Sequence, residues 1–138
     1  RRARGLCCIT GDVTINAGDA LMGSDVTLYF IDGGLHINGH ALVQLSAPAA
    51  AANASPALPN ILIYVPASNA QPVQINGNSD SFFMGVIYAP ASEIEVLGTG
   101  QVHGLQMAQF IGWDVRVGGT ADIWLGWTSS GLPICTVP

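Results

Sequence analysis

The chain has 138 residues, about the size of a single domain; 49% of them are hydrophobic and only 9% are charged. It contains no lysine, and three of its four arginines lie within the first four residues, so it lacks the basic face that nucleic-acid binding requires. No apolar run reaches the roughly 18 residues that indicate a membrane-spanning helix, so we expect no transmembrane segment in this chain.

The first element along the chain is predicted to be a short N-terminal arm, residues 1–8, which contains the adjacent cysteines Cys7 and Cys8. A third cysteine, Cys135, lies near the other end. None has the CxxC spacing of zinc or redox sites, so we expect no metal and no other cofactor. A disulfide from Cys135 to Cys7 or Cys8 would stabilise the fold by roughly 4–5 kcal/mol. It would leave one thiol either to pair with another subunit or to stay buried and inert.

A short pattern then recurs along the chain: two apolar residues flank a third residue, and Asn or Gly follows. Its copies begin at residues 13, 35, 73, 94 and 115, so most of them start 21 or 22 residues apart. Each period also holds two further short apolar segments, such as residues 26–30 and 41–45. Three short alternating strands per period are typical of one coil of a β-helix, in which the stacking of coils builds the core.

One period is longer than the others because of a stretch rich in Pro, Ala and Ser, residues 46–60, which we predict to be an inserted loop. Asn53 in this loop fits the N-x-[ST] pattern of a glycosylation acceptor. Helices are not expected, since 17 Gly and 8 Pro interrupt every helical periodicity. The sequence therefore predicts an all-β fold, a single right-handed parallel β-helix (solenoid) domain spanning residues 1–138. It would have about five coils of 21–22 residues and a C-terminal tail, residues 126–138.

The residues that end each repeat are predicted to be structural corners without a catalytic role. Asn and Gly tolerate positive φ there, and Asn amides can stack from coil to coil. These residues are Asn16, Asn38, Gly39, Asn76, Gly77, Gly98 and Gly119.

The ordered series of motifs resembles the β-helical C-terminal region of bacterial Tad/Flp-type (TadG-like) pilus-assembly and cell-surface proteins. The matching stretches are residues 5–16 (GLCCITGDVTIN), 26–29 (VTLY), 33–48 (GGLHINGHALVQLSAP), 61–64 (ILIY), 73–79 (VQINGNS) and 85–90 (GVIYAP), within a resemblance that covers about the first 120 residues. Cys8 matches the cysteine of the family pattern, whereas Cys7 is additional. The resemblance implies a surface-exposed structural role in the bacterial envelope and carries over no catalytic residues.

Aromatic residues gather in the last coils, where an open β-helix exposes backbone and core. They are Phe110, Trp113, Trp124 and Trp127. The three tryptophans have no counterpart in the family pattern. We consider three roles for this set: it caps the β-helix, it forms an interface between copies, or it stacks on the faces of sugar rings.

Some β-helix proteins degrade polysaccharides, with convergent carboxylates and a cation on the outer face. Arg116 is the one basic side chain in the body of the chain, and it aligns with Glu95 one period earlier, which predicts an exposed ion pair of low energy. His36 and His40 bracket one Ile-Asn-Gly corner, whereas His103 lies in a different strand set about three coils away, so we do not expect them to bind a metal.

We therefore expect a non-enzymatic structural subunit of an extracellular or cell-surface assembly, such as a pilus-like filament of the bacterial envelope. Its first partner would be itself, through the ends or faces of the β-helix, and other envelope or pilus components or a surface glycan would be further partners. Two alternatives stay open: an adhesin-like module that binds glycan or another surface, and a polysaccharide-degrading β-helix enzyme.

Overall fold

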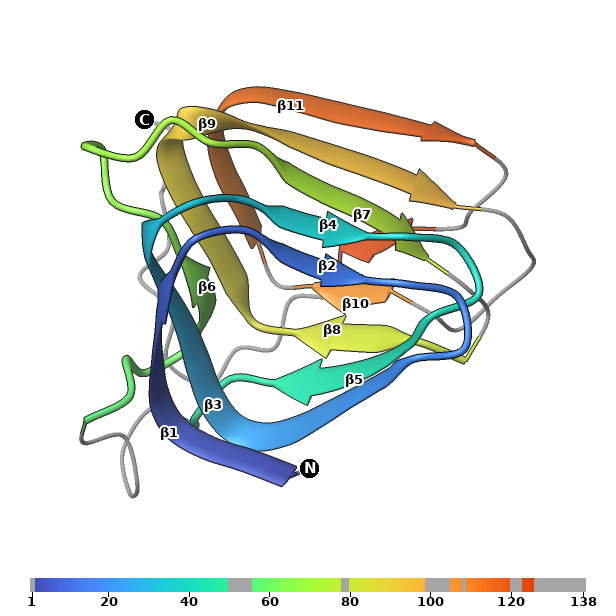
Figure 1. Ribbon diagram of the computed structural model, residues 1–138, viewed down its shortest axis with the longest axis horizontal. Coiled ribbons are helices and arrows are strands. Elements are labelled where there is room, and N and C mark those ends of the chain that lie inside the picture. The colour runs from blue at the N-terminus through green and yellow to red at the C-terminus, as the bar shows by residue number, and fades with distance from the viewer. Residues whose placement is uncertain are drawn as a thin grey trace, which may run out of the picture.

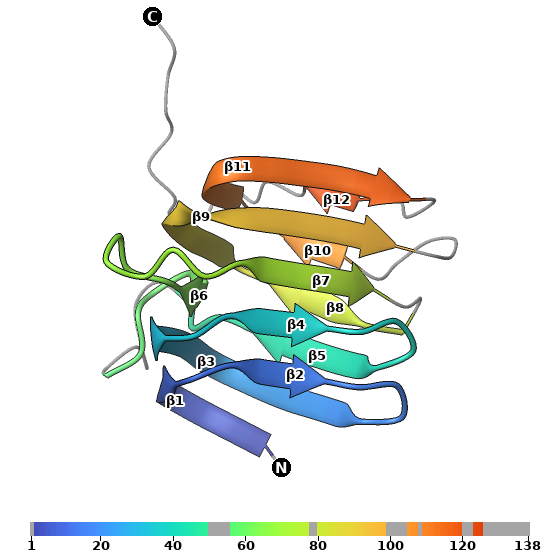
Figure 2. The ribbon, with the colours of Figure 1, turned by 45° about the horizontal axis from the view of Figure 1, so that its top comes forward.

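The structure is a computed structural model that describes residues 2–49, 56–77, 80–98, 105–107, 109–119 and 123–125. All regular secondary structure in these residues is β-strand, and every strand pair is parallel. The chain winds into a three-sided solenoid whose layers run from β1 and β2 at one end to β11 and β12 at the other (Figure 1, Figure 2). The predicted all-β parallel solenoid is therefore confirmed.

The first side is built from the recurring apolar triplets, which pair in register from one coil to the next. Side chains alternate along a strand, so the apolar residues of each triplet point inward and the central residue points outward. Five strands are stacked on this side. The solenoid has about four complete turns, slightly fewer than the five coils expected. The strands of this side are β2 (Val13–Ile15), β4 (Leu35–Ile37), β7 (Val73–Gly77) and the later parts of β9 (Val86–Gly98) and β11 (Gln109–Gly119).

Longer strands join the sides of the solenoid to one another. The second side consists of β1 (Arg2–Thr10), the later part of β3 (Ala20–Asp32), β6 (Ile61–Tyr64) and the early parts of β9 and β11. The third side consists of the early part of β3 with β5 (Leu42–Ser46) and β8 (Phe82–Met84), followed by β10 (Leu105–Met107) and β12 (Ile123–Leu125). β3 passes from the third side to the second at Asp25, which has a positive φ of 55°.

The interior is a continuous column of aliphatic side chains with two phenylalanines. Phe30 from the second side and Phe83 from the third are both fully buried. Around them lie the inward residues of the triplets and of the other two sides, including Leu35, Ile37, Leu45, Leu62, Ile63, Ile75, Ile87 and Ile94. No single coil could bury these residues alone, so the stacking of coils makes the core.

Glycine is required where two coils approach closely at the corner after the second side. Gly33 has a φ of +82°, and a Cβ built there would lie 2.1 Å from the carbonyl carbon of Gly11 in the coil below. A side chain at residue 33 would therefore push these two coils apart.

The expected boundaries need two corrections. The prediction of a separate N-terminal arm, residues 1–8, is wrong. These residues belong largely to β1, which pairs with β3 along most of its length and is the first strand of the second side. The inserted loop is shorter than predicted, because Ser46 still belongs to β5 and hydrogen bonds hold both ends of the loop. Residues 50–55 of the loop, with Asn53, and the tail 126–138 lie outside the described residues.

Candidate functional site

The C-terminal end of the solenoid exposes side chains that the strand alternation directs toward the core. Val115 and Val117 of β11 continue the inward columns of Ile94 and Val96 of β9, their register partners. Ile94 and Val96 are 0% and 1% exposed, whereas Val115 and Val117 are 40% and 57% exposed. Among the residues that the structure describes, these two valines are core residues at the top of the stack without a full layer above them.

The aromatic residues predicted to gather at this end do not share one environment. Phe110 points inward above Ile87 and packs against the core. Trp113 is 83% exposed and lies at the register shift between Gly112 and Asp114. The backbone of Trp124 belongs to β12, but its side chain, like the whole of Trp127, lies outside what the structure describes.

The N-terminal end of the solenoid also leaves core-facing apolar side chains partly exposed. Cys7 and Ile9 of β1, and Val13 and Ile15 of β2, are half-buried apolar residues that pack against the core from below. In the described part of the chain, β1 pairs with β3 alone and β2 with β4 alone, so each has one edge without a partner strand. An edge of this kind, with apolar side chains beside it, is a template for a further strand.

The two adjacent cysteines have different environments because neighbouring residues of a strand point to opposite faces. Cys7 faces the interior and is half-buried, whereas Cys8 faces outward and is exposed; both are free thiols. Cys135 lies outside the described residues. Cys8 is thus the thiol of this pair that a partner could reach.

A polar ladder runs along the outer surface of the first side. His36 Nδ1 lies 2.9 Å from Gln74 Oε1, and the amide of Gln74 donates a hydrogen bond of 3.2 Å to Glu95 Oε2. Glu95 is in register with Arg116, as expected. The side chains of His36 and Gln74 therefore bond to the next coil, which joins coils on the outside as the core does on the inside.

The predicted ion pair between Glu95 and Arg116 is not the contact that forms. Arg116 instead donates a hydrogen bond of 2.9 Å to Asp114 and lies 3.5 Å from Glu93. The hydrogen bond to Asp114, and next the charge of Glu93, raise the pKa of Arg116 above its ordinary value. Arg116 is thus a permanent cation on the outer surface of the last coil, with two carboxylates beside it.

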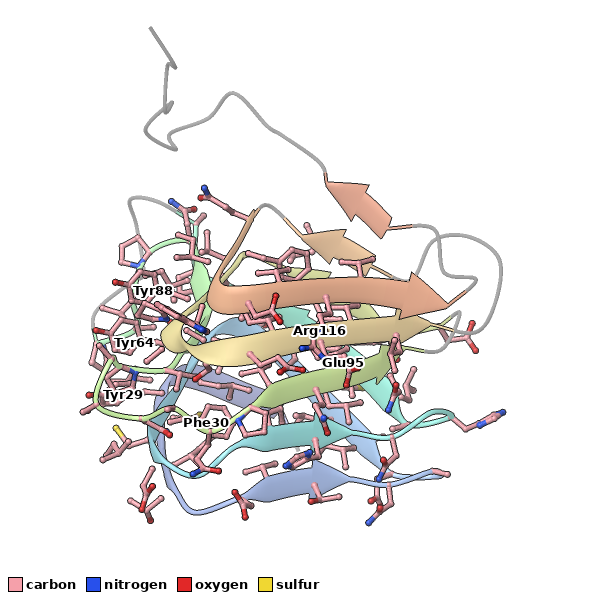
Figure 3. All side chains as sticks on the ribbon, turned by 90° about the horizontal axis from the view of Figure 1, so that it is seen from above. Tyr29, Phe30, Tyr64, Tyr88, Glu95 and Arg116 are labelled. Atoms are coloured by element: carbon pink, nitrogen blue, oxygen red, sulfur yellow. The ribbon has the colours of Figure 1, made fainter. Side chains whose placement is uncertain are left out.

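A stack of three tyrosines on the second side was not singled out by sequence reasoning. Tyr29, Tyr64 and Tyr88 are in register in successive coils, with ring centroids 5.1 and 5.4 Å apart (Figure 3). Each closes an apolar segment (VTLY, ILIY, GVIY), and this repeated position is the signal that could have revealed the stack. The Tyr64 and Tyr88 rings are nearly parallel, so their facing surfaces cover each other and are closed to sugar rings.

The corner residues lie where coils meet, with one difference from expectation. The Asn38 amide donates a hydrogen bond of 2.9 Å to Asn16 Oδ1, while the register of β4 and β7 places Asn76 on the next rung. Gly77, Gly98 and Gly119 are in register in three successive coils. Positive φ occurs at Gly119, but at the asparagine corners it occurs at Gly18 and His40, two residues after the Asn, and not at Gly39.

Thr27 fixes the inserted loop to the body of the solenoid. It is fully buried, and its hydroxyl accepts a hydrogen bond of 2.9 Å from the Leu58 amide and donates one of 2.8 Å to the Ile61 carbonyl. The Asn60 amide closes the base of the loop with a hydrogen bond of 2.9 Å to the Pro48 carbonyl.

Within the described ranges, no three His, Cys, Asp or Glu side chains converge in a way that would hold a metal ion. His40 is exposed at its corner, and His103 lies outside these ranges. None of the described residues forms a helix with the length and apolar character needed to cross a membrane. Comparison with protein-family models, with curated proteins and with solved structures finds no match.

Proposed function

We propose that the chain is a non-enzymatic structural subunit of an extracellular or cell-surface assembly, and that it self-associates through the ends of its solenoid. The exposure of core-facing residues at the C-terminal end carries this proposal: Val117 is 57% exposed, and Val96, one rung below in the same column, is 1% exposed. Covering such residues with another layer is favourable, since it removes apolar surface from water.

The low charge of the chain supports the same function. Only 9% of the residues are charged, and the outer ladder of the first side is mainly neutral, with His36 and Gln74 bonded to the coils beside them. A surface with few charged side chains has few charges to strip of water on contact, so neighbouring molecules can pack closely.

Placement in the bacterial envelope is supported by the resemblance to Tad/Flp-type surface proteins. That resemblance rests on the ordered motifs between residues 5 and 90. An exported structural protein needs stiffness more than a reaction centre, and stacked coils with a continuous core supply it.

Light scattering after size-exclusion chromatography, together with negative-stain electron microscopy, tests the proposal over a range of protein concentrations. We expect particles that grow in mass with concentration and lengthen along one axis. The variant Val117→Lys should stay monomeric, because it places a charge on the exposed end of the core. The control Ala70→Lys adds the same charge in an exposed loop beside the middle coils and should assemble normally. Monomers at every concentration, or equal assembly of both variants, would refute the proposal.

A further inference from the structure

We propose that the partner at the ends is a second copy of this chain, stacked head to tail, so that its β1 and β2 add in parallel and in register onto β11 of the first copy. This inference rests on the proposed function and specifies its interface. Such contacts join two different surfaces of the same protein and therefore propagate into an open filament.

The two ends carry equivalent positions of one repeat. Inside the molecule, one inward column runs Val13, Leu35, Val73, Ile94 and Val115. The rung above Val115 would be filled by Val13 of the second copy, and the rung above Val117 by its Ile15. The interface would thus repeat the contact that each coil already makes with the next.

The three sides of the solenoid also match at the junction. At the N-terminal end, Arg2 and Ala3 lie on the third side, residues 5–10 of β1 on the second, and β2 on the first. At the C-terminal end, β12 lies on the third side, and β11 covers the second and the first. A copy shifted along the axis therefore places each of its sides above the same side of its neighbour, with parallel strands as everywhere else in the molecule.

The charges at the junction are compatible with this stacking. Asp12 directly precedes Val13 just as Asp114 precedes Val115 and Glu93 precedes Ile94. Arg116, with 60% of its side chain exposed, already contacts Asp114 in its own coil and Glu93 in the coil below. Asp12 of the second copy would arrive one coil above Asp114, where the same guanidinium can offset its charge.

A mixing experiment separates head-to-tail stacking from stacking of two like ends. Val13→Lys blocks the N-terminal end, and Val117→Lys blocks the C-terminal end. If stacking is head to tail, each variant alone stays monomeric, and an equimolar mixture forms a dimer that grows no further, seen by sedimentation velocity. Dimers of one variant alone would show that like ends meet and would overturn the proposal.

A disulfide experiment tests the register with an independent variant. On the second side, one outward column runs Cys8, Tyr29, Tyr64, Tyr88 and Ile111, so Cys8 of the second copy would lie above Ile111. Neighbouring strands are about 4.8 Å apart, which is within the Cα separation that a disulfide spans. The protein used is Ile111→Cys with Cys7→Ala and Cys135→Ser, checked for folding by circular dichroism.

Mild oxidation should convert this protein into a ladder of covalent multimers that dithiothreitol reverses. The control Gln74→Cys, in the same background, places its thiol on the middle of the first side and should give no more than dimers. If the unmodified chain forms filaments but Ile111→Cys also stops at dimers, the register is wrong while the proposed function stands. If the unmodified chain forms no filament, both fail.

Discussion

Val96 and Val117 form a matched pair of sites, because they occupy one inward column in adjacent coils. Truncation of valine to alanine removes two methyl-sized groups, worth about 1.6 kcal/mol when both are fully buried. In the middle of the stack it also leaves a cavity, so we expect Val96→Ala, at 1% exposure, to lower the free energy of unfolding by about 2–3 kcal/mol. Val117 is 57% exposed, so Val117→Ala should lower the free energy of unfolding by less than half of the full transfer energy, about 0.7 kcal/mol.

The effects of the two variants on self-association should rank in the opposite order from their effects on stability. Urea unfolding, followed by circular dichroism at a concentration where the chain is monomeric, measures the stability of both variants. Sedimentation at high concentration then measures assembly, which Val117→Ala should weaken more than Val96→Ala does. An equal loss of monomer stability in the two variants would mean that the C-terminal end is already covered within one molecule, and the reasoning from exposed core residues would be refuted.

Two further predictions concern single side chains. Thr27→Val should destabilise the protein by about 1–3 kcal/mol, because it leaves the part-buried Leu58 amide without its acceptor, while Thr27→Ser should keep nearly full stability. Urea unfolding of the two variants checks this, and equal losses would contradict it. A maleimide reagent should modify Cys8 faster than Cys7, because Cys8 faces outward and Cys7 faces the core, with mass spectrometry to locate the label; equal rates would show that β1 is not held in its strand.

The repeat made most of the fold predictable from the sequence. Its five triplets give the register of the first side directly, since residues 13, 35, 73, 94 and 115 fall in one inward column. Alternation also identifies which residue of each triplet points outward, and it aligned Glu95 with Arg116 correctly. The register of the strands does not determine which group the end of a long side chain contacts. The guanidinium of Arg116 contacts Asp114 and Glu93, although Glu95 is its register partner.

Asn69 is a feature that sequence reasoning missed because its role depends on contacts between distant parts of the chain. Asn69 lies in the connection between β6 and β7, where it resembles an ordinary turn residue, yet it is 5% exposed. Its amide donates hydrogen bonds to the carbonyls of Phe30 and Gly33 in the coil below, and Ser92 in the coil above donates to its backbone carbonyl. Composition indicates a turn at this position, but only the stacked coils show that the turn binds two neighbours.

The closed base of the inserted loop has a consequence for engineering. The contacts of Thr27 and the hydrogen bond between Asn60 and Pro48 hold the two ends of the loop together. The position at which β6 begins the next coil is therefore independent of the residues between these ends. Residues between Ala49 and Pro56, which are both exposed, can then change in length or sequence at a small entropic penalty and without altering the register of the coils. This position is the natural place to graft a foreign peptide, and a filament of such subunits would display it once per subunit at regular intervals.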